Sequence, residues 1–272
     1  MNTRDIDRTF GGSVPELYDT WLVPLIFQPY AVDLARRAAS RLPKRVLEVA
    51  AGTGVVTRAM ATALSDDATI VATDLNRPML DRASALPIAR SVDWRKADAL
   101  RLPFDDGAFD IVVCQFGVMF FPDKPLAFSE ALRVLAPGGA FLFNVWDRIE
   151  ENEFADVVTT ALSGLFPSDP PRFLARTPHG YSDRETIERD LRRGGFTRSA
   201  TFETLAARSR APSPLHPAIA YCQGTPLRNE IEARSSDELA TATRICADAI
   251  ASRFGPGPVE GKIQAHVVVA EL

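Results

Sequence analysis

The sequence predicts an α/β protein whose seven-stranded, mostly parallel sheet is covered by helices on both faces. Two observations carry this prediction. Short apolar runs alternate with helical patterns between Lys44 and Asp147, as they do in βαβ units. The first apolar run also leads through a glycine turn directly into a helix, which is typical of parallel sheets that bind ligands. In a chain of 272 residues, a hydrophobic fraction of 46% is enough to build a sizeable core.

The first half of the chain contains five predicted strands. They cover residues 45–50, 68–74, 92–98, 109–117 and 140–146. Helical patterns lie between them: apolar residues repeat at helical spacing after Gly54, after Asn76 as a plausible N-cap, and from Phe128 onward. The helix that contains Phe128 should end at Pro137, because the Pro-Gly-Gly run that begins there does not continue a helix.

The second half of the chain is less regular. Residues 151–166 and 183–194 have helical patterns, whereas residues 196–209 and 262–272 are strand-like. Between the two strands lies a proline-containing segment, about 209–260, with one helical pattern from Asp237 to Arg253. This segment is too long for a plain connection and is interpreted as a helical insertion, on the substrate side or at a dimer contact.

We expect a single domain with three parts. Residues 1–43 form an N-terminal helical cover, residues 44–147 a ligand-binding core, and residues 148–272 a C-terminal part that contains the insertion. Residues 15–42 are rich in aromatic side chains and are predicted to form two short helices.

Composition and charge exclude several classes of protein. Lys and Arg number 31 and Asp and Glu 35, for a net charge of −4, so a generic nucleic-acid or membrane-surface binder is not expected. Three scattered cysteines, Cys114, Cys222 and Cys246, are too few for a disulfide framework or a zinc site. No apolar run is long enough for a membrane span, and the first residues lack the apolar core of a secretory signal. We therefore expect a cytoplasmic protein.

The sharpest motif is VLEVAAGTG at residues 46–54. Gly52 and Gly54 allow positive φ and close approach of a ligand, and the following helix offers its free N–H groups. The alternative is a tight turn without a ligand. A dinucleotide fingerprint would need a third glycine where this chain has Thr57, and Glu48 lies at the strand end, so both residues count against NAD and FAD. A phosphate loop would need a G-K-[ST] run, and its absence counts against ATP and GTP.

Acidic residues follow the next two strands. Asp74 lies about 20 residues after Gly54, where a carboxylate can accept two hydrogen bonds from a ribose diol; alternatively it caps a helix. Asp98 follows the third strand, where it could accept from an adenine amino group; alternatively its partner is turn backbone. Leu75 and Met79 could hold the adenine between them or belong to the core.

Taken together, these features resemble class I S-adenosylmethionine-dependent methyltransferases, close to the small-molecule group that includes the ubiquinone and menaquinone methyltransferases. Four segments carry the resemblance: residues 46–59, 71–83, 96–121 and 130–146. It implies a Rossmann-like fold whose last strand is antiparallel, with S-adenosyl-L-methionine as cofactor. The commoner first motif, E-x-G-x-G-x-G, has a glycine where this chain has Ala50.

The resemblance also implies the cofactor-binding residues. The methionine part is held by the first motif, which consists of Glu48, Ala50, Gly52 and Gly54, and the ribose is held by Asp74. The adenine lies against Leu75 and Met79, with Asp98 and Ala99 at its edge. The wall near the methionyl carboxylate and the sulfonium is formed by Gln115 and Phe116. The N-terminal segment is similar to the cofactor-covering helices of the group. We expect Tyr18, and after it Tyr30, to close over the methionyl end, unless these rings only cap the sheet.

The predicted function is S-adenosylmethionine-dependent methylation of a small molecule, with no nucleic-acid partner, no metal, and a homodimer left open. The alternative is a non-catalytic regulatory protein that binds S-adenosylmethionine or a nucleoside; a nicotinamide oxidoreductase is weakened by Thr57. A general base is needed only if the acceptor must lose a proton. The candidates His179, Tyr181, His216 and His266 are more often structural, so no catalytic residue is assigned.

Overall fold

The computed structural model describes residues 14–234 and 238–272. Within it the chain forms two compact units. The sheet unit consists of residues 29–145, 181–205 and 266–272, and the helical unit consists of the described residues within 14–28, 146–180, 206–234 and 238–265. These boundaries cut across the expected divisions at residues 43 and 147, and the single domain stays a prediction.

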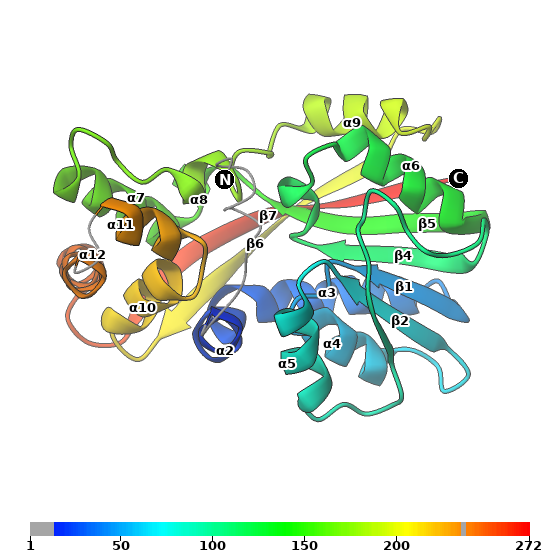
Figure 1. The fold of residues 1–272 in the computed structure, drawn as a ribbon, viewed down its shortest axis with the longest axis horizontal. Coiled ribbons are helices and arrows are strands. Elements are labelled where there is room, and N and C mark those ends of the chain that lie inside the picture. The colour runs from blue at the N-terminus through cyan, green and yellow to red at the C-terminus, as the bar shows by residue number, and fades with distance from the viewer. Residues whose placement is uncertain (1–13, 235–237) are drawn as a thin grey trace. The chain divides into compact units, whose positions relative to one another are not determined.

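The sheet contains seven strands in the order β3-β2-β1-β4-β5-β7-β6. Their bounds are β1 Arg45–Val49, β2 Thr69–Asp74, β3 Asp93–Lys96, β4 Phe109–Gln115, β5 Leu135–Trp146, β6 Thr201–Ala211 and β7 Val259–Glu271. Strands β1 to β5 pair in parallel, and β7 runs against the others (Figure 1). The predicted fold class and its antiparallel last strand are therefore confirmed.

Burial explains why β1 and β4 occupy the middle of the sheet. Both strands are short apolar runs, and nearly all their side chains are buried, as expected of strands covered on both faces. The helices of the sheet unit are α3 Gln28–Ala39, α4 Val55–Ala63, α5 Arg77–Ala85, α6 Lys124–Val134 and α9 Arg184–Arg193, with a 3-10 turn, η2, at Val118–Phe120. Figure 1 shows α6 and α9 on one side of the strands and α3, α4 and α5 on the other.

The end of α6 differs from the sequence prediction. The helix ends at Val134 instead of reaching Pro137, and β5 begins at once with Leu135, which pairs with Phe109. The pairing register then shifts, so that the extra residues of the Pro-Gly-Gly run form a bulge. A side chain at Gly139 would place its Cβ 2.8 Å from the carbonyl oxygen of Asp110, so glycine lets the two strands approach each other here.

The helical unit begins with one uninterrupted helical stretch where two short helices were expected. Helix α2 (Val14–Leu17) continues into the π-helix η1 (Tyr18–Phe27), which leads into α3. Pro24 lies inside η1. Because proline has no N–H and its ring clashes with the preceding turn of an α-helix, a locally wider turn accommodates it.

The insertion contains more helix than the sequence predicted. The unit's further elements are η3 Ile149–Glu151, α7 Glu153–Leu165, α8 Phe173–Arg176, α10 Leu215–Gln223, α11 Leu227–Arg234 and α12 Leu239–Phe254. Helix α12 matches the predicted pattern, although its expected first residue, Asp237, lies outside the described residues. The prolines that suggested irregular chain mark helix starts instead: Pro217 lies in the first turn of α10, and Pro226 directly precedes α11.

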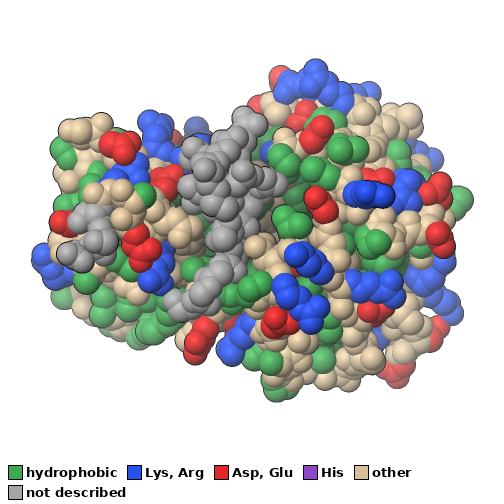
Figure 2. Space-filling view, viewed as in Figure 1, with side chains coloured by type: hydrophobic (Ala, Val, Ile, Leu, Met, Phe, Trp, Pro, Cys, Tyr) green, Lys and Arg blue, Asp and Glu red, His purple; other side chains and the backbone are tan. Residues whose placement is uncertain are grey.

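Charged side chains of both signs are interspersed on the face shown in Figure 2. The three cysteines carry free thiols and are buried. Within residues 14–234 and 238–272, no helix has both the length and the apolar character needed to cross a membrane, and no cluster of His, Cys, Asp or Glu could hold a metal ion.

Candidate functional site

The carboxyl ends of five neighbouring parallel strands bring the predicted site residues to one edge of the sheet. Along the order β3-β2-β1-β4-β5, this edge carries Asp98, then Asp74, then the turn at residues 50–54, then Gln115, and finally Asn144. Ligands of open α/β sheets bind at this edge. Asn144 was not singled out in the sequence, because one asparagine in an apolar strand gives no motif signal.

The turn after β1 is built from left-handed backbone. Ala50, Gly52 and Gly54 have φ of 56°, 56° and 81°. For Ala50 this conformation is strained, on the order of 1–2 kcal/mol for a residue with a Cβ. Gly54 is also crowded, since a Cβ there would lie 2.8 Å from Cη2 of Trp94. Gly54 is therefore required by both its backbone conformation and its surroundings, whereas at Gly52 glycine only avoids the strain that Ala50 carries.

Asp74, the last residue of β2, connects this turn to the next loop. Its Oδ2 accepts from the Gly52 N–H at 2.9 Å and its Oδ1 from the Asn76 N–H at 2.7 Å. Asn76 is the N-cap residue of α5 as predicted, but it makes no capping bond through its side chain. Burial raises the pKa of Asp74 despite these hydrogen bonds. Asn76 Nδ2 also donates to Oδ1 at 3.4 Å. Oδ2 therefore keeps a second lone pair with which it can accept from a ligand, and at Oδ1 a ligand hydroxyl would replace this long bond.

Glu48 is a second buried acid at the same edge. The Thr57 hydroxyl donates to its Oε2 at 2.5 Å. Burial raises the pKa of Glu48 to about 8, and this hydrogen bond opposes the rise. At the position where a dinucleotide-binding turn has glycine, this chain has Thr57, whose hydroxyl donates a hydrogen bond to the buried Glu48 carboxyl group.

The residues expected around the adenine differ in exposure. Met79 is buried, and its Cε lies 3.7 Å from where a Cβ on Gly52 would be, whereas the Leu75 side chain is 40% exposed. Asp98 is exposed, and its Oδ1 accepts from the Leu100 N–H at 3.0 Å, as the turn interpretation expected. Ala99 follows it at intermediate exposure. Their roles toward adenine stay predictions.

The loop after β4 contains the second strained position. Phe116 has φ of 51°, and its N–H donates both to the Asn144 carbonyl at 3.1 Å and to Asn144 Oδ1 at 3.0 Å. Its ring meets Tyr30 edge to face at 5.3 Å. A Cβ on Gly117 would lie 2.6 Å from the Ala50 Cβ, so the loops after β1 and β4 are in contact. Strained backbone of this kind is concentrated at functional sites.

The other predicted residues have local partners. Tyr18 belongs to the helical unit, where it stacks on Phe27 at 5.1 Å between ring centroids, and its role at the cofactor stays a prediction. Tyr30, in the sheet unit, donates to the Leu205 carbonyl at 3.2 Å. Tyr181 donates to Asp190 at 2.9 Å.

The three histidines also have local partners. His179 lies in the helical unit with Nδ1 2.8 Å from the Asp147 carbonyl oxygen, and burial lowers its pKa to about 4. A carbonyl only accepts, so Nδ1 carries the proton and Nε2 keeps the lone pair. His216 packs edge-on against Trp21, and burial lowers its pKa. His266 Nδ1 lies 3.0 Å from the Thr204 hydroxyl.

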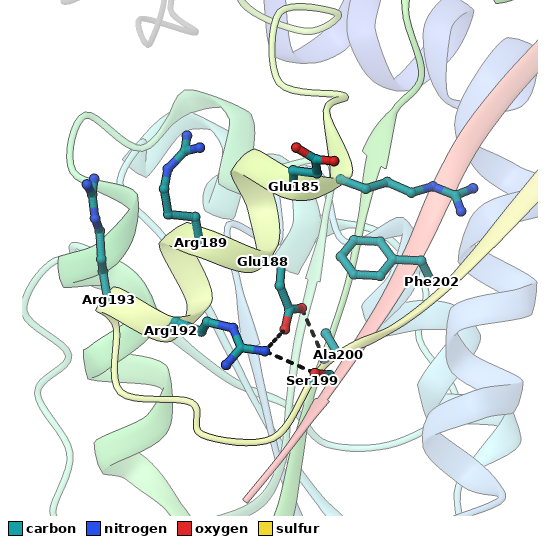
Figure 3. Close-up of a pocket in the computed structure, with 9 residues that line it drawn as sticks. Glu185, Glu188, Arg189, Arg192, Arg193, Ser199, Ala200 and Phe202 are labelled. Atoms are coloured by element: carbon teal, nitrogen blue, oxygen red, sulfur yellow. Dashed lines mark hydrogen bonds and ion pairs between the residues drawn. The ribbon is translucent and has the colours of Figure 1, made fainter.

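A surface hollow of about 710 Å³ lies beside α9 and the start of β6 (Figure 3). Glu188 accepts from Arg192 at 3.0 Å and from the Ala200 N–H at 3.1 Å, and Arg192 also donates to Ser199. Arg189 and Arg193 point away from this network in Figure 3. The hollow is open and is lined largely by the apolar stems of charged side chains and by Phe202, and its lining shares no residue with the edge that carries Asp74.

Comparisons with known proteins identify the family. Residues 47–143 match the family described as "Methyltransferase domain". The demethylmenaquinone methyltransferase of Thermus thermophilus is 46% identical over 186 residues, which cover 64% of this chain and 82% of that protein. The ubiquinone/menaquinone biosynthesis C-methyltransferase UbiE of Ectopseudomonas mendocina is 33% identical over 57% of this chain, and the match spans 65% of its length.

Solved structures support the fold. The YcgJ protein of Bacillus subtilis aligns with a TM-score of 0.55 at 18% identity, covering 89% of this chain and 98% of that one. A phosphoethanolamine N-methyltransferase of Haemonchus contortus aligns with a TM-score of 0.59 at 18% identity, covering 100% of this chain and 60% of that one. The family match and the quinone methyltransferase relatives agree with the turn after β1 and the row of polar strand ends. The chain therefore belongs to the class I S-adenosylmethionine-dependent methyltransferases and is similar to UbiE.

Proposed function

We propose that this S-adenosylmethionine-dependent methyltransferase methylates a small-molecule acceptor, with a quinol ring as the first candidate class. One observation carries the proposal: the 46% identity to a demethylmenaquinone methyltransferase across 82% of that protein. The net charge of −4 agrees with it, because nucleic-acid acceptors are bound through phosphate neutralisation by basic residues.

The polar groups at the sheet edge fit the cofactor. Among the described residues, four buried side-chain atoms lack a hydrogen-bond partner, and three of them belong to this edge: Thr53 Oγ1, Gln115 Oε1 and Asn144 Nδ2. Buried polar groups without partners are rare in folded proteins. A ligand with donors and acceptors of its own would satisfy them, and S-adenosylmethionine has both.

In this proposal, residues at the sheet edge bind the cofactor and orient it. Asp74 accepts from the ribose hydroxyls through its remaining lone pairs, and Leu75 covers the adenine. The left-handed turn at residues 50–54 lets backbone approach the methionine part. When bound, the cofactor supplies a methyl group activated by its positive sulfur, and the protein supplies position.

No general base is included in this proposal. His179 is neutral at neutral pH, and a pKa of about 4 makes its Nε2 a weak base. Tyr18 and residues 15–30 are proposed as a cover, and hydrogen exchange with and without S-adenosylhomocysteine tests this: protection should rise across the segment, and unchanged protection contradicts the cover.

Calorimetry and methyl transfer test the proposed function together. The protein should bind S-adenosylmethionine and S-adenosylhomocysteine but not NAD. With labelled S-adenosylmethionine it should methylate at least one member of a panel of short-chain quinols, and it should leave RNA and protein unlabelled. Cofactor binding without methylation of any small molecule, together with labelling of RNA or protein, would overturn the proposed acceptor class.

A further inference from the structure

Asn144 is the fully buried polar side chain on β5 at the carboxyl edge of the sheet. It pairs in register with Gln115 on β4. Its amide orientation is fixed by the backbone, because the atom that faces the Phe116 N–H at 3.0 Å must be the acceptor Oδ1. The other amide atom is therefore the donor Nδ2.

The Nδ2 donor has no partner among the described residues, and neither has Gln115 Oε1. These two groups could have bonded to each other, since one donates and the other accepts and their residues are register neighbours. They do not. A donor and an acceptor are thus both left open on adjacent strand ends.

The strand order indicates which part of the cofactor reaches them. Asp98 follows β3 and Asp74 ends β2, and these are the proposed adenine and ribose positions. From the ribose, the amino-acid arm must run away from the adenine, across β1 and toward β4 and β5. Strands lie about 4.8 Å apart, so β4 is roughly 10 Å and β5 roughly 14 Å from β2. An extended methionyl arm reaches the end of β4, and the Asn144 amide lies there too, because its Oδ1 accepts from the Phe116 N–H directly after β4 at 3.0 Å. That arm ends in a carboxylate, which accepts, and an ammonium, which donates.

We propose that Asn144 binds the methionyl carboxylate of the cofactor through Nδ2 while its Oδ1 holds the strained Phe116 backbone. Gln115 Oε1 accepts from the ammonium group. The inference rests on S-adenosylmethionine as cofactor and on Asp74 at its ribose. In this arrangement the Asn144 side chain both holds the Phe116 backbone and binds the cofactor. The hydrogen bond from the Phe116 N–H to Oδ1 fixes the direction in which Nδ2 points.

Two ligands separate this role from a purely structural one. S-Adenosylhomocysteine carries the methionyl-type arm, whereas 5′-methylthioadenosine has the same nucleoside without the amino acid. Asn144→Ala should weaken S-adenosylhomocysteine about 10- to 100-fold, the range expected for a lost hydrogen bond to a charged group. It should change 5′-methylthioadenosine by less than about threefold, a margin set by small packing effects.

A near-isosteric variant and a control sharpen the test. Asn144→Asp keeps the acceptor for Phe116 but opposes the carboxylate with a second negative charge, so it should weaken S-adenosylhomocysteine at least as much. Asn152 is an equally buried amide in the helical unit, with Gln264 and the Asp147 and Arg148 carbonyls as partners. Asn152→Ala should lower the midpoint of thermal unfolding and leave both affinities unchanged.

The outcomes are distinct. Equal weakening of both ligands by Asn144→Ala, or weakening of neither, overturns the inference. Where the Asn144 variants do not fold, the wild-type protein decides: it should bind S-adenosylhomocysteine about 10- to 100-fold more tightly than the decarboxylated analogue, and equal binding overturns the inference. A wild-type protein that binds neither S-adenosylhomocysteine nor 5′-methylthioadenosine contradicts the cofactor itself.

Discussion

Buried carboxylates have different kinds of hydrogen-bond partner in the two units of this protein. In the helical unit, Glu230 on α11 accepts from the Arg176 guanidinium at 2.7 Å and from the Arg172 N–H at 2.7 Å. In the sheet unit, the hydrogen-bond donors to Glu48 and Asp74 are a hydroxyl and amide groups. The charge of Arg58 opposes the rise in the pKa of Glu48 without a direct hydrogen bond to it. Burial raises the pKa of both acids.

The difference separates packing from function. A buried acid paired with arginine is costly to unpair, because removing one partner leaves the other charge buried and uncompensated. Acids whose pKa burial raises, and which have no ion pair, cost stability, and such costs are concentrated at sites where a ligand is bound. Substitutions of the unpaired acids at the sheet edge should therefore change cofactor affinity or pH dependence, whereas substitution of the arginine-paired Glu230 should change only stability.

The largest effect is expected at Asp74. Asp74→Ala removes the proposed acceptor for two ribose hydroxyls and should weaken S-adenosylhomocysteine binding by about 2–4 kcal/mol, less whatever water restores. Calorimetry measures this, and Asp74→Asn is the matched control that keeps the size and one acceptor. A folded Ala variant with an unchanged dissociation constant would remove Asp74 from the site.

The second prediction concerns the pH dependence of stability at Glu48. Its pKa is about 8 in the folded protein against an ordinary 4.5. A group with a raised folded pKa contributes its full stability below pH 4.5, and this contribution is lost as pH rises toward 8. The wild-type protein should lose about 2–4 kcal/mol of unfolding free energy over that window through this residue.

Glu48→Gln keeps the acceptor for Thr57 and removes the titration. Urea unfolding at pH 5 and pH 8 should therefore show a smaller loss in Glu48→Gln than in the wild-type protein. The same loss in both proteins would mean that the Glu48 carboxyl does not carry a raised pKa.

Glu230 tests the other side of the comparison. Glu230→Ala leaves the Arg172 N–H and the Arg176 guanidinium without their acceptor and should cost about 1–3 kcal/mol of unfolding free energy. The dissociation constant for S-adenosylhomocysteine should stay within about twofold. A selective loss of cofactor affinity at unchanged stability would break the distinction between the two units.

The smallest effect is expected at Ala50. Ala50→Gly relieves a left-handed φ of 56° but adds freedom to the unfolded chain, so a net gain of about 0.5 kcal/mol is expected. The opposite kind of substitution at the neighbouring loop, Gly117→Ala, should destabilise the protein, because the new Cβ would lie 2.6 Å from the Ala50 Cβ. Thermal unfolding of both variants checks the pair, and destabilisation by Ala50→Gly would show that the turn is not strained.

Local patterns were sufficient to predict most of the sheet unit. The strands around β1 and β4 are short apolar runs bounded by glycine or polar turns, and their parallel pairing follows from the helices between them. The row of strand ends then followed from topology alone. The start of β5 was missed because a bulge depends on the partner strand, which local sequence does not reveal.

The remaining site features depend on tertiary packing. Phe116 has left-handed backbone although it is not a glycine, so the sequence does not signal this conformation. Asn144 accepts a hydrogen bond from the Phe116 N–H, which is 28 positions away in the sequence. Helices α10 and α11 were missed because prolines suggested loops where they mark helix starts. Thr57 was noted only as a missing glycine, and its bond to Glu48 emerges when strand and helix are packed.

The closeness of Trp94 to Gly54 has an optical consequence. Of the three tryptophans in the chain, Trp21 and Trp146 belong to the helical unit, and only Trp94 lies in the sheet unit, with its indole against the turn after β1. With Trp21 and Trp146 replaced by phenylalanine, the ultraviolet emission of the protein comes from one ring beside the glycines. That ring would report the arrival of a nucleoside at the turn by a change in intensity or wavelength, without any label attached.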